Sequence, residues 1–444
     1  MSPARSPNPR SPNPRSPRLA SARGGSCENR SSDQQGNEIT TEITTATLPD
    51  RAGSAAEVLW TALKLGLTSF GGPIAHLGYY ERTYVQEHRW LSSDQYGELV
   101  SLCQLLPGPT SSQVGFLVGM HRAGWKGALA AWVGFTLPSA LLMYAFALFV
   151  PTAPGPRMQA LLHGLMLTAV VVVAQAVWSM ARALAPDMRR RAIAVAACVP
   201  LLYLHSGFAQ FVTLVGGAVV GSILCRSATQ SRSKLPTGLN TRAAWTAFGI
   251  FLALLVTLSS TAGFTAHGPL VLASIFYRSG AFVFGGGHVV LPLLQQALVP
   301  AGWISDERFL AGYGFAQAMP GPLFTLAAYL GAASAPPHQS FLWALLALIA
   351  IFLPGLLLAI TSLSLLGRIA DSKTGNAILA GINAAVVGVL AAALYKPVWA
   401  SAVRSFVDVA IVLVALVLLM RFKRPPILIA ALCVGASIAG SIIG

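Results

Sequence analysis

Long apolar segments recur along this chain, and they constrain its fold more than any other feature. Residues 128–150, 161–183 and 341–366 together contain a single charged side chain, Arg182. A helix needs about 20 apolar residues to cross a ~30 Å hydrocarbon layer, and each of these segments is that long. A membrane β-barrel would instead show alternation over about ten residues. We therefore predict an all-α integral membrane protein in contact with membrane lipid.

The charge distribution supports a membrane protein and excludes nucleic-acid binding. Only 10% of the 444 residues are charged, whereas a soluble domain carries about 25%. The net charge is +15, but the basic residues are spread over the N-terminal region and short inter-helix loops rather than over a basic, aromatic-rich domain. Positive-inside topology accounts for them, so we expect no nucleic acid among the partners.

Residues 1–52 differ in composition from the rest of the chain. They repeat Arg-Ser-Pro-Asn-Pro and continue as polar Ser/Thr/Gln sequence, which predicts a disordered cytoplasmic tail. An organellar transit peptide is the alternative, although the prolines oppose the amphipathic helix that such signals need. No hydrophobic signal-peptide core follows, so we expect the first membrane helix to direct insertion.

The chain repeats itself, and four motifs recur in the same order. The matched pairs are residues 64–73 with 278–287, 90–94 with 303–306, 104–109 with 317–322, and 135–138 with 352–354. In both halves the tryptophan of the second motif precedes the first proline of the third by 17 residues. This register predicts two homologous repeats, 53–225 and 244–444, joined by a basic cytoplasmic linker at 226–243.

Counting hydrophobic spans gives the relative orientation of the repeats. We predict about thirteen, centred near residues 67, 109, 139, 171, 198, 216, 253, 284, 322, 353, 386, 413 and 434. The first motif helix is then number one and its equivalent number eight, so the two cross the membrane in opposite directions. Most basic loops fall on the side of the N-terminal tail, and the loops at Arg82 and Arg89, at Arg157, and at Lys396 and Arg404 depart from this pattern. Inverted repeats are typical of secondary transporters, which bind substrate near the midplane where the halves meet.

The Pro-Gly-Pro motifs at 107–109 and 320–322 predict broken helices. Two prolines remove backbone donors and glycine adds flexibility, so a continuous helix is disfavoured. A break leaves a helix N-terminus with free N–H groups and partial positive charge, which suits a tetrahedral oxyanion. One such motif alone would more often be structural, but its recurrence favours a site.

The candidate substrate-binding residues surround these motifs in both halves. They are Lys64, Gly71, Gly72, Gln104, Pro107, Gly108, Pro109, Ser111, Ser112, Arg278, Gly285, Gly286, Gly287, His288, Gln317, Pro320, Gly321, Pro322 and Thr325. The glycines permit close approach of backbone, and Lys64 and Arg278 could offset anionic charge or extend toward lipid headgroups. His76 and His288 could carry protons, but a packed, hydrogen-bonded histidine is the simpler interpretation.

Other polar and aromatic residues have structural interpretations. Ser92, with Gln95 three residues on, is predicted to cap a helix, as is Ser305 or Asp306. Trp90 and Trp303 are predicted to anchor at the membrane interface.

The motifs as a set resemble the chromate ion transporter family, of the long-chain, two-repeat type. The resemblance rests on Phe-Gly-Gly-Pro at 70–73, Trp-Leu-Ser at 90–92 and the segment 104–109, with their second copies, and covers roughly residues 55–440. It implies a bacterial inner-membrane protein that expels chromate, driven by membrane potential or coupled to protons, and so confers resistance.

Two rival functions are weighed against chromate export. A carrier of sulfate or another oxyanion would share every feature, because chromate and sulfate have the same shape and charge. A membrane enzyme would need convergent nucleophile and acid/base groups, and the acidic residues lie mostly in loops or the tail. No P-loop sequence is present, so we expect neither ATP nor any cofactor. The sequence leaves the oligomeric state open, a homodimer included.

Overall fold

The computed structural model describes residues 53–150, 155–204, 207–225, 241–260, 268–363 and 373–443. Throughout these residues the ordered elements are helices, so the chain is an all-α membrane protein. The predicted tail, 1–52, lies outside the described residues. So does the predicted linker, 226–243, except for its last three residues, which begin a helix.

The first repeat contains eight helical segments among the described residues. They are α1 Ala55–Thr68, α2 Gly72–Tyr80, η1 Glu81–Glu87, α3 Ser93–Gln104, α4 Thr110–Phe149, α5 Pro156–Leu184, α6 Met188–Tyr203 and α7 Gly207–Leu224. The helix α8, Thr241–Ser260, follows before the second copy of the motifs begins.

The second repeat follows the first segment by segment. Its helices are α9 Pro269–Ala281, η3 Gly287–Val289, α10 Val290–Leu298, α11 Asp306–Ala318, η4 Leu323–Thr325, α12 Leu326–Ala333, α13 Ser340–Thr361, α15 Lys373–Ala393, η6 Leu394–Trp399, α16 Ala400–Ala402, α17 Phe406–Met420 and α18 Pro426–Ile443. The motif register makes α1 equivalent to α9 and α3 to α11, and the order of helices beyond the motifs pairs α5, α6 and α7 with α15, α17 and α18.

The helix α4 is continuous by hydrogen bonding, but it corresponds to two helices of the second repeat. Its 40 residues contain non-helical backbone at Ala123 and at Gly124, where φ is +61° and ψ is −151°. The part before this kink corresponds to η4 and α12, and the part after it corresponds to α13. The loop between α12 and α13 is therefore equivalent to the kink in α4.

The predicted count of about thirteen spans is not confirmed by the described residues. Five described helical stretches are long and apolar enough to cross a membrane: Thr110–Phe149, Pro156–Leu184, Thr241–Ser260, Ser340–Thr361 and Thr374–Ala402. The predicted span centres near residues 67, 109, 284 and 322 lie at helix ends or between helices, close to glycines and prolines that interrupt the helices. The predicted breaks at both Pro-Gly-Pro motifs are therefore confirmed.

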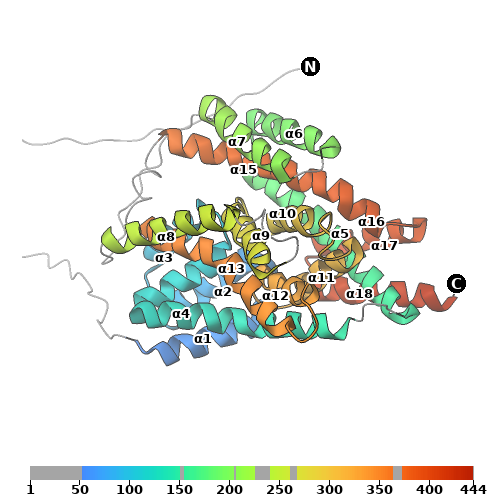
Figure 1. Ribbon diagram of the computed structural model, residues 1–444, viewed down its shortest axis with the longest axis horizontal. Coiled ribbons are helices and arrows are strands. Elements are labelled where there is room, and N and C mark those ends of the chain that lie inside the picture. Colours follow the sequence, from blue (N-terminus) through green and yellow to red (C-terminus); the bar gives the residue numbers. More distant parts are fainter. Residues whose placement is uncertain are drawn as a thin grey trace, which may run out of the picture. The chain divides into compact units, whose positions relative to one another are not determined.

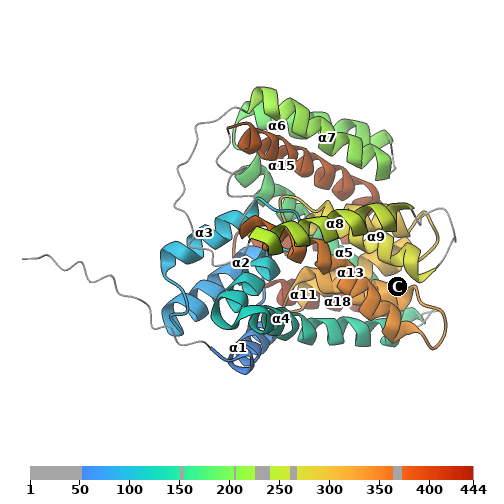
Figure 2. The same cartoon turned by 60° about the vertical axis from the view of Figure 1, so that its left-hand side comes forward.

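The last helices of each repeat pack against the other repeat. The helix α15 lies beside α6 and α7, and the three form a group of their own in both views (Figures 1 and 2). In the equivalent arrangement, α5 lies beside α17 and α18. A partly buried pair joins helices of the second group, in which His163 Nε2 lies 2.9 Å from Asp408 Oδ1. The two repeats thus exchange helices instead of forming separate bodies.

The capping predictions are confirmed, and the anchor predictions are wrong. The Ser92 hydroxyl accepts from the Gln95 N–H in a full capping box, and the Ser305 hydroxyl accepts from the Arg308 N–H. Trp90 and Trp303 are only 5% and 7% exposed, so both are packed inside the protein rather than placed against headgroups. Trp90 stacks on Tyr84 with 5.1 Å between ring centroids.

Candidate functional site

The Pro-Gly-Pro loop of each repeat donates a hydrogen bond to the other repeat, and the two bonds are equivalent. We call the region around these two bonds the crossing. The Gly108 N–H donates to the Val283 carbonyl at 2.7 Å, and the Gly321 N–H donates to the Ser69 carbonyl at 2.9 Å. Gly108 and Gly321 are the central residues of the two Pro-Gly-Pro motifs. Ser69 and Val283 each directly precede a Phe-Gly-Gly segment. Each Pro-Gly-Pro loop therefore binds the other repeat at the end of its first helix.

Only glycine fits at the centre of each loop. Gly108 and Gly321 have φ values of +114° and +96°, a region that L side chains rarely adopt. A Cβ at Gly108 would lie 3.0 Å from Gly355 Cα, and one at Gly321 would lie 2.7 Å from Ser139 Oγ. The loops thus press backbone against the partner repeat.

Helix N-termini converge on this crossing. The helix α4 begins after Pro109 and η4 after Pro322, and neither start has a side-chain cap. The Phe-Gly-Gly segments lead into α2 and η3, and a Cβ at Gly287 would lie 3.7 Å from Pro73 Cγ, its repeat equivalent. Gly71, Gly72, Gly285 and Gly286 all have positive φ. Uncapped starts leave N–H groups free, so the crossing carries partial positive charge.

Gln113 holds the first break together. Its side-chain amide donates to the Pro107 carbonyl at 2.8 Å and to the Gly355 carbonyl at 3.0 Å, and the residue is fully buried. It thereby joins the Pro-Gly-Pro loop of the first repeat to α13 of the second.

His76 connects the two breaks of the first repeat. Its Nε2 lies 3.2 Å from the Ser69 carbonyl and its Nδ1 lies 3.3 Å from Ser111 Oγ. Because a carbonyl only accepts, the neutral ring carries its proton on Nε2, and the Ser111 hydroxyl donates to Nδ1. The ring is buried and meets Phe135 edge-on, so it is a packed, hydrogen-bonded histidine.

Several buried polar atoms around the crossing make no hydrogen bond with the described residues. They are Ser69 Oγ, Ser112 Oγ, Thr136 Oγ1 and Gln113 Oε1. Buried hydroxyls in native proteins are nearly always partnered, so these atoms are candidates for contact with a bound molecule.

The second repeat contributes a smaller polar group. His288 Nδ1 lies 2.9 Å from the Tyr313 hydroxyl and 3.4 Å from the Gln317 amide nitrogen. The Thr325 hydroxyl is already used, because it donates to the Pro322 carbonyl at 2.8 Å.

Three predicted site residues take no part in the hydrogen bonds of the crossing. Lys64 is exposed on α1 with Nζ 5.3 Å from the Trp60 ring centroid, and Gln104 is exposed at the end of α3. Arg278 is half-buried in the last turn of α9, where its Nε donates to the Ser274 carbonyl at 3.3 Å.

The sequence prediction missed Ser69, Thr136 and Ser139. Each is a small hydroxyl residue within an apolar run, next to a Phe-Gly-Gly or to Pro138. That proximity to a motif was the available signal.

Comparison with known proteins matches the family model described as chromate transporter over residues 56–222 and 270–439. The two segments correspond to the two copies of the motifs, and α8, most of which lies in the predicted repeat 244–444, falls outside both. No solved structure matches the chain.

Curated relatives cover most of the chain. A chromate transport protein of Pseudomonas aeruginosa is 27% identical over 79% of this chain and 83% of its own length. A chromate transport protein of Cupriavidus metallidurans is 26% identical over 85% of this chain and 90% of its own. A probable chromate transport protein of Synechococcus elongatus is 28% identical over 75% and 81%. With its family model matched across both repeats, the chain belongs to the chromate transporter family.

Proposed function

We propose that this protein is a secondary transporter that exports chromate from the cytoplasm across a bacterial inner membrane and so confers chromate resistance. The observation that carries the proposal is the buried crossing of the two Pro-Gly-Pro loops, which gathers uncapped helix N-termini and unpartnered hydroxyls. Such a site offers hydrogen-bond donors and partial positive charge to an oxyanion without a fixed counter-charge. The relatives named as chromate transport proteins support chromate as the substrate.

The two breaks together make the proposed site. Gly71, Gly72, Pro107–Pro109, Ser111 and Ser112 come from the first repeat, and Gly285–His288, Gln317, Pro320–Pro322 and Thr325 come from the second. Each repeat supplies one loop that presses against the other, so loss of either loop should disable transport. Arg278, half-buried one helical turn before the break, adds positive charge on the approach. Lys64 and Gln104 are exposed, so we assign them to the entrance rather than to the pocket.

The membrane potential is a sufficient driving force for export. Moving one charge through 100 mV is worth ~2.3 kcal/mol, so a dianion leaving an inside-negative cell gains about twice that. We therefore propose export without ATP and without a cofactor. Because its relatives are named as transporters, we propose no enzymatic role.

Uptake of labelled chromate into inverted membrane vesicles tests the function. The potential and the pH gradient are set independently with ionophores, and vesicles without the protein are the control. We expect accumulation driven by potential, reduced by excess sulfate if both anions share the site. Uptake no greater than in the control vesicles would overturn the proposal. A response to the pH gradient alone would identify a coupled proton, and the mass of the purified protein in detergent would identify a homodimer.

A further inference from the structure

The two repeats carry chemically opposite side chains at equivalent positions around the crossing. Five buried positions of the first repeat are polar, and we call them the polar corner: Ser69, His76, Ser111, Thr136 and Ser139. Their equivalents in the second repeat, which we call the apolar corner, are also buried: Val283, Val290, Phe324, Phe352 and Gly355. The second set has no side-chain donor at any position.

The equivalence of these positions rests on the structure as well as on the motifs. A Cβ at Gly66 of α1 would lie 2.7 Å from the Phe135 carbonyl of α4. At the equivalent crossing, Gly280 of α9 lies against the Ile351 carbonyl of α13. In each repeat the carbonyl belongs to the residue three positions before a proline, Pro138 or Pro354. The corners therefore occupy the same place in the two repeats.

Hydrogen bonds join the residues of the polar corner into two sets. His76 joins Ser69 to Ser111, and the Ser139 hydroxyl donates to the Thr136 carbonyl at 3.2 Å. The loop at Gly321 lies against both sets, because its N–H donates to the Ser69 carbonyl and a Cβ on Gly321 would lie 2.7 Å from Ser139 Oγ. The second repeat thus closes the polar corner of the first.

Several buried hydroxyls in and beside the polar corner have no hydrogen-bond partner among the described residues. Ser69 is 0% exposed and Thr136 is 2% exposed, and the hydroxyl of each makes no hydrogen bond with the described residues. Ser112, at 2% exposure in the uncapped first turn of α4, is in the same condition. A tetrahedral anion accepts from several donors at once, so it would satisfy these hydroxyls and the free N–H groups of the helix start together.

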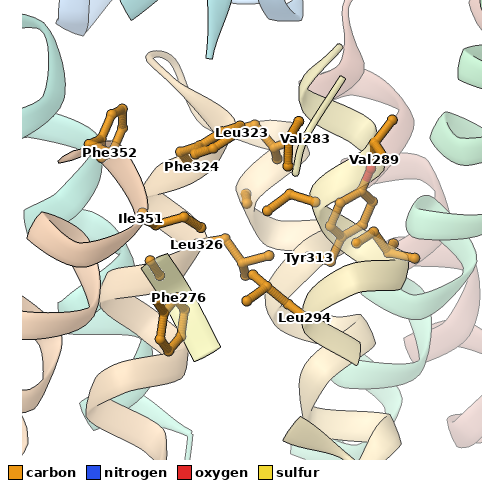
Figure 3. Close-up of a cluster of buried hydrophobic side chains, with 14 of the residues drawn as sticks. Phe276, Val283, Val289, Leu294, Tyr313, Leu323, Phe324, Leu326, Ile351 and Phe352 are labelled. Carbon is orange, nitrogen blue, oxygen red and sulfur yellow. The ribbon is translucent and has the colours of Figure 1, made fainter. Parts of the chain in front are cut away.

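The apolar corner cannot replace the hydration shell of an anion. Figure 3 shows Val283, Phe324 and Phe352 within one cluster of buried hydrophobic side chains, and the two phenylalanine rings have centroids 5.6 Å apart. Ionised groups enter such surroundings only when they are hydrogen-bonded. The place that mirrors the polar corner is therefore closed to chromate.

We propose that, within the site enclosed by both loops, the dehydrated oxyanion is held at the polar corner of the first repeat by the hydroxyls of Ser69, Thr136 and the neighbouring Ser112, and that the apolar corner is a dry seal. This inference rests on the proposed transport of oxyanions. The side chains that hold the anion then come from one repeat, although the backbones of the two repeats are arranged alike. The loop at Gly321 must withdraw for the anion to enter.

The test removes single hydroxyls and measures chromate binding to the purified full-length protein. Thr136→Val keeps the side-chain shape, and Ser69→Ala removes only the oxygen. Each should lower chromate affinity by about tenfold, the usual value of one hydrogen bond to a charged group. Without anion, thermal unfolding of Thr136→Val should occur at the same or a higher temperature, because the lost hydroxyl had no partner.

Ser274→Ala is the matched control. Ser274 is fully buried in α9 with an unpartnered hydroxyl, yet it belongs to neither corner. Chromate affinity should be unchanged in this variant. Wild-type affinity in both Ser69→Ala and Thr136→Val, or an equal loss in Ser274→Ala, would overturn the polar corner while transport by the wild-type protein stands. If the wild-type protein neither binds nor transports chromate or sulfate, the proposed function fails first.

Discussion

Gly321 lies so close to Ser139 that a Cβ on the glycine would be 2.7 Å from the serine oxygen. This contact joins the Pro-Gly-Pro loop of the second repeat to the post-kink part of α4 in the first. Gly321→Ala should therefore force the loop away from Ser139 and reduce chromate transport by about tenfold or more, since strained backbone and a clash each cost about 1–3 kcal/mol. Transport assays in vesicles measure the effect. Gly78→Ala is the control, because nothing lies within 4 Å of its Cβ position, and it should transport normally. Equal transport by both variants would contradict a tight loop contact.

Disrupting the conformation of a break should abolish transport. Pro107→Ala with Gly108→Leu would remove the glycine that the positive φ requires and place a side chain where the anion is proposed to bind. The double change at Pro320 and Gly321 should have the same effect. Efflux is measured beside the amount of protein in the membrane.

Proline substitutions away from the breaks are the comparison for these double variants. Pro138 and Pro354 lie inside helices, so replacing them with Ala should change packing or gating more than affinity. Normal efflux from well-inserted double variants would show that the breaks are only structural.

Charge near the crossing should depend on Arg278 more than on Lys64. Arg278 is half-buried beside the break, whereas Lys64 is exposed and lies over Trp60. Arg278→Gln should weaken chromate binding by about tenfold, roughly the value of one charge-assisted interaction, and Arg278→Lys should restore most of it. Lys64→Gln should have the smaller effect. Binding titrations at low and high salt check both expectations. An effect of Lys64→Gln as large as that of Arg278→Gln would contradict the larger role of Arg278.

Equivalent positions of the two repeats should face opposite sides of the membrane. Asp94 and Glu307 are equivalent and exposed, each near the N-terminus of its helix, α3 or α11. A single cysteine at one or the other position, in a variant without the native cysteines, should react with an impermeant thiol reagent from opposite sides of the membrane. Labelling of both from one side would end the inverted arrangement. A reporter within 226–240 should lie in the cytoplasm.

Much of this architecture could be predicted because it depends on local chemistry. Apolar length predicts spans, and Pro-Gly-Pro disrupts a helix wherever it occurs, so the segments and both breaks follow from sequence. The exchange of α5 and α15 between the repeats does not follow, because apolar helices of similar length fit several neighbours equally well. The burial of Trp90 depends on the same tertiary packing.

The place of the crossing could be predicted from the motifs, but its contacts could not. The glycine contacts at Gly66 and Gly280, which align Thr136 with Phe352, depend on tertiary packing. Lys64 and Arg278 occupy equivalent positions in sequence, and only packing makes one exposed and the other half-buried. Helical position alone does not determine which face meets lipid, protein or water.

The exchange of helices has a consequence for how such a chain can arise and be divided. A polypeptide with one repeat alone would leave α5 without α17 and α18, and would leave α6 and α7 without α15. It could bury those faces only by joining a second copy inserted the other way up. The two halves of this protein, produced as separate polypeptides, should therefore be degraded when expressed singly and should assemble when expressed together. Fusion into one chain keeps together two halves that each need the other to bury their helices.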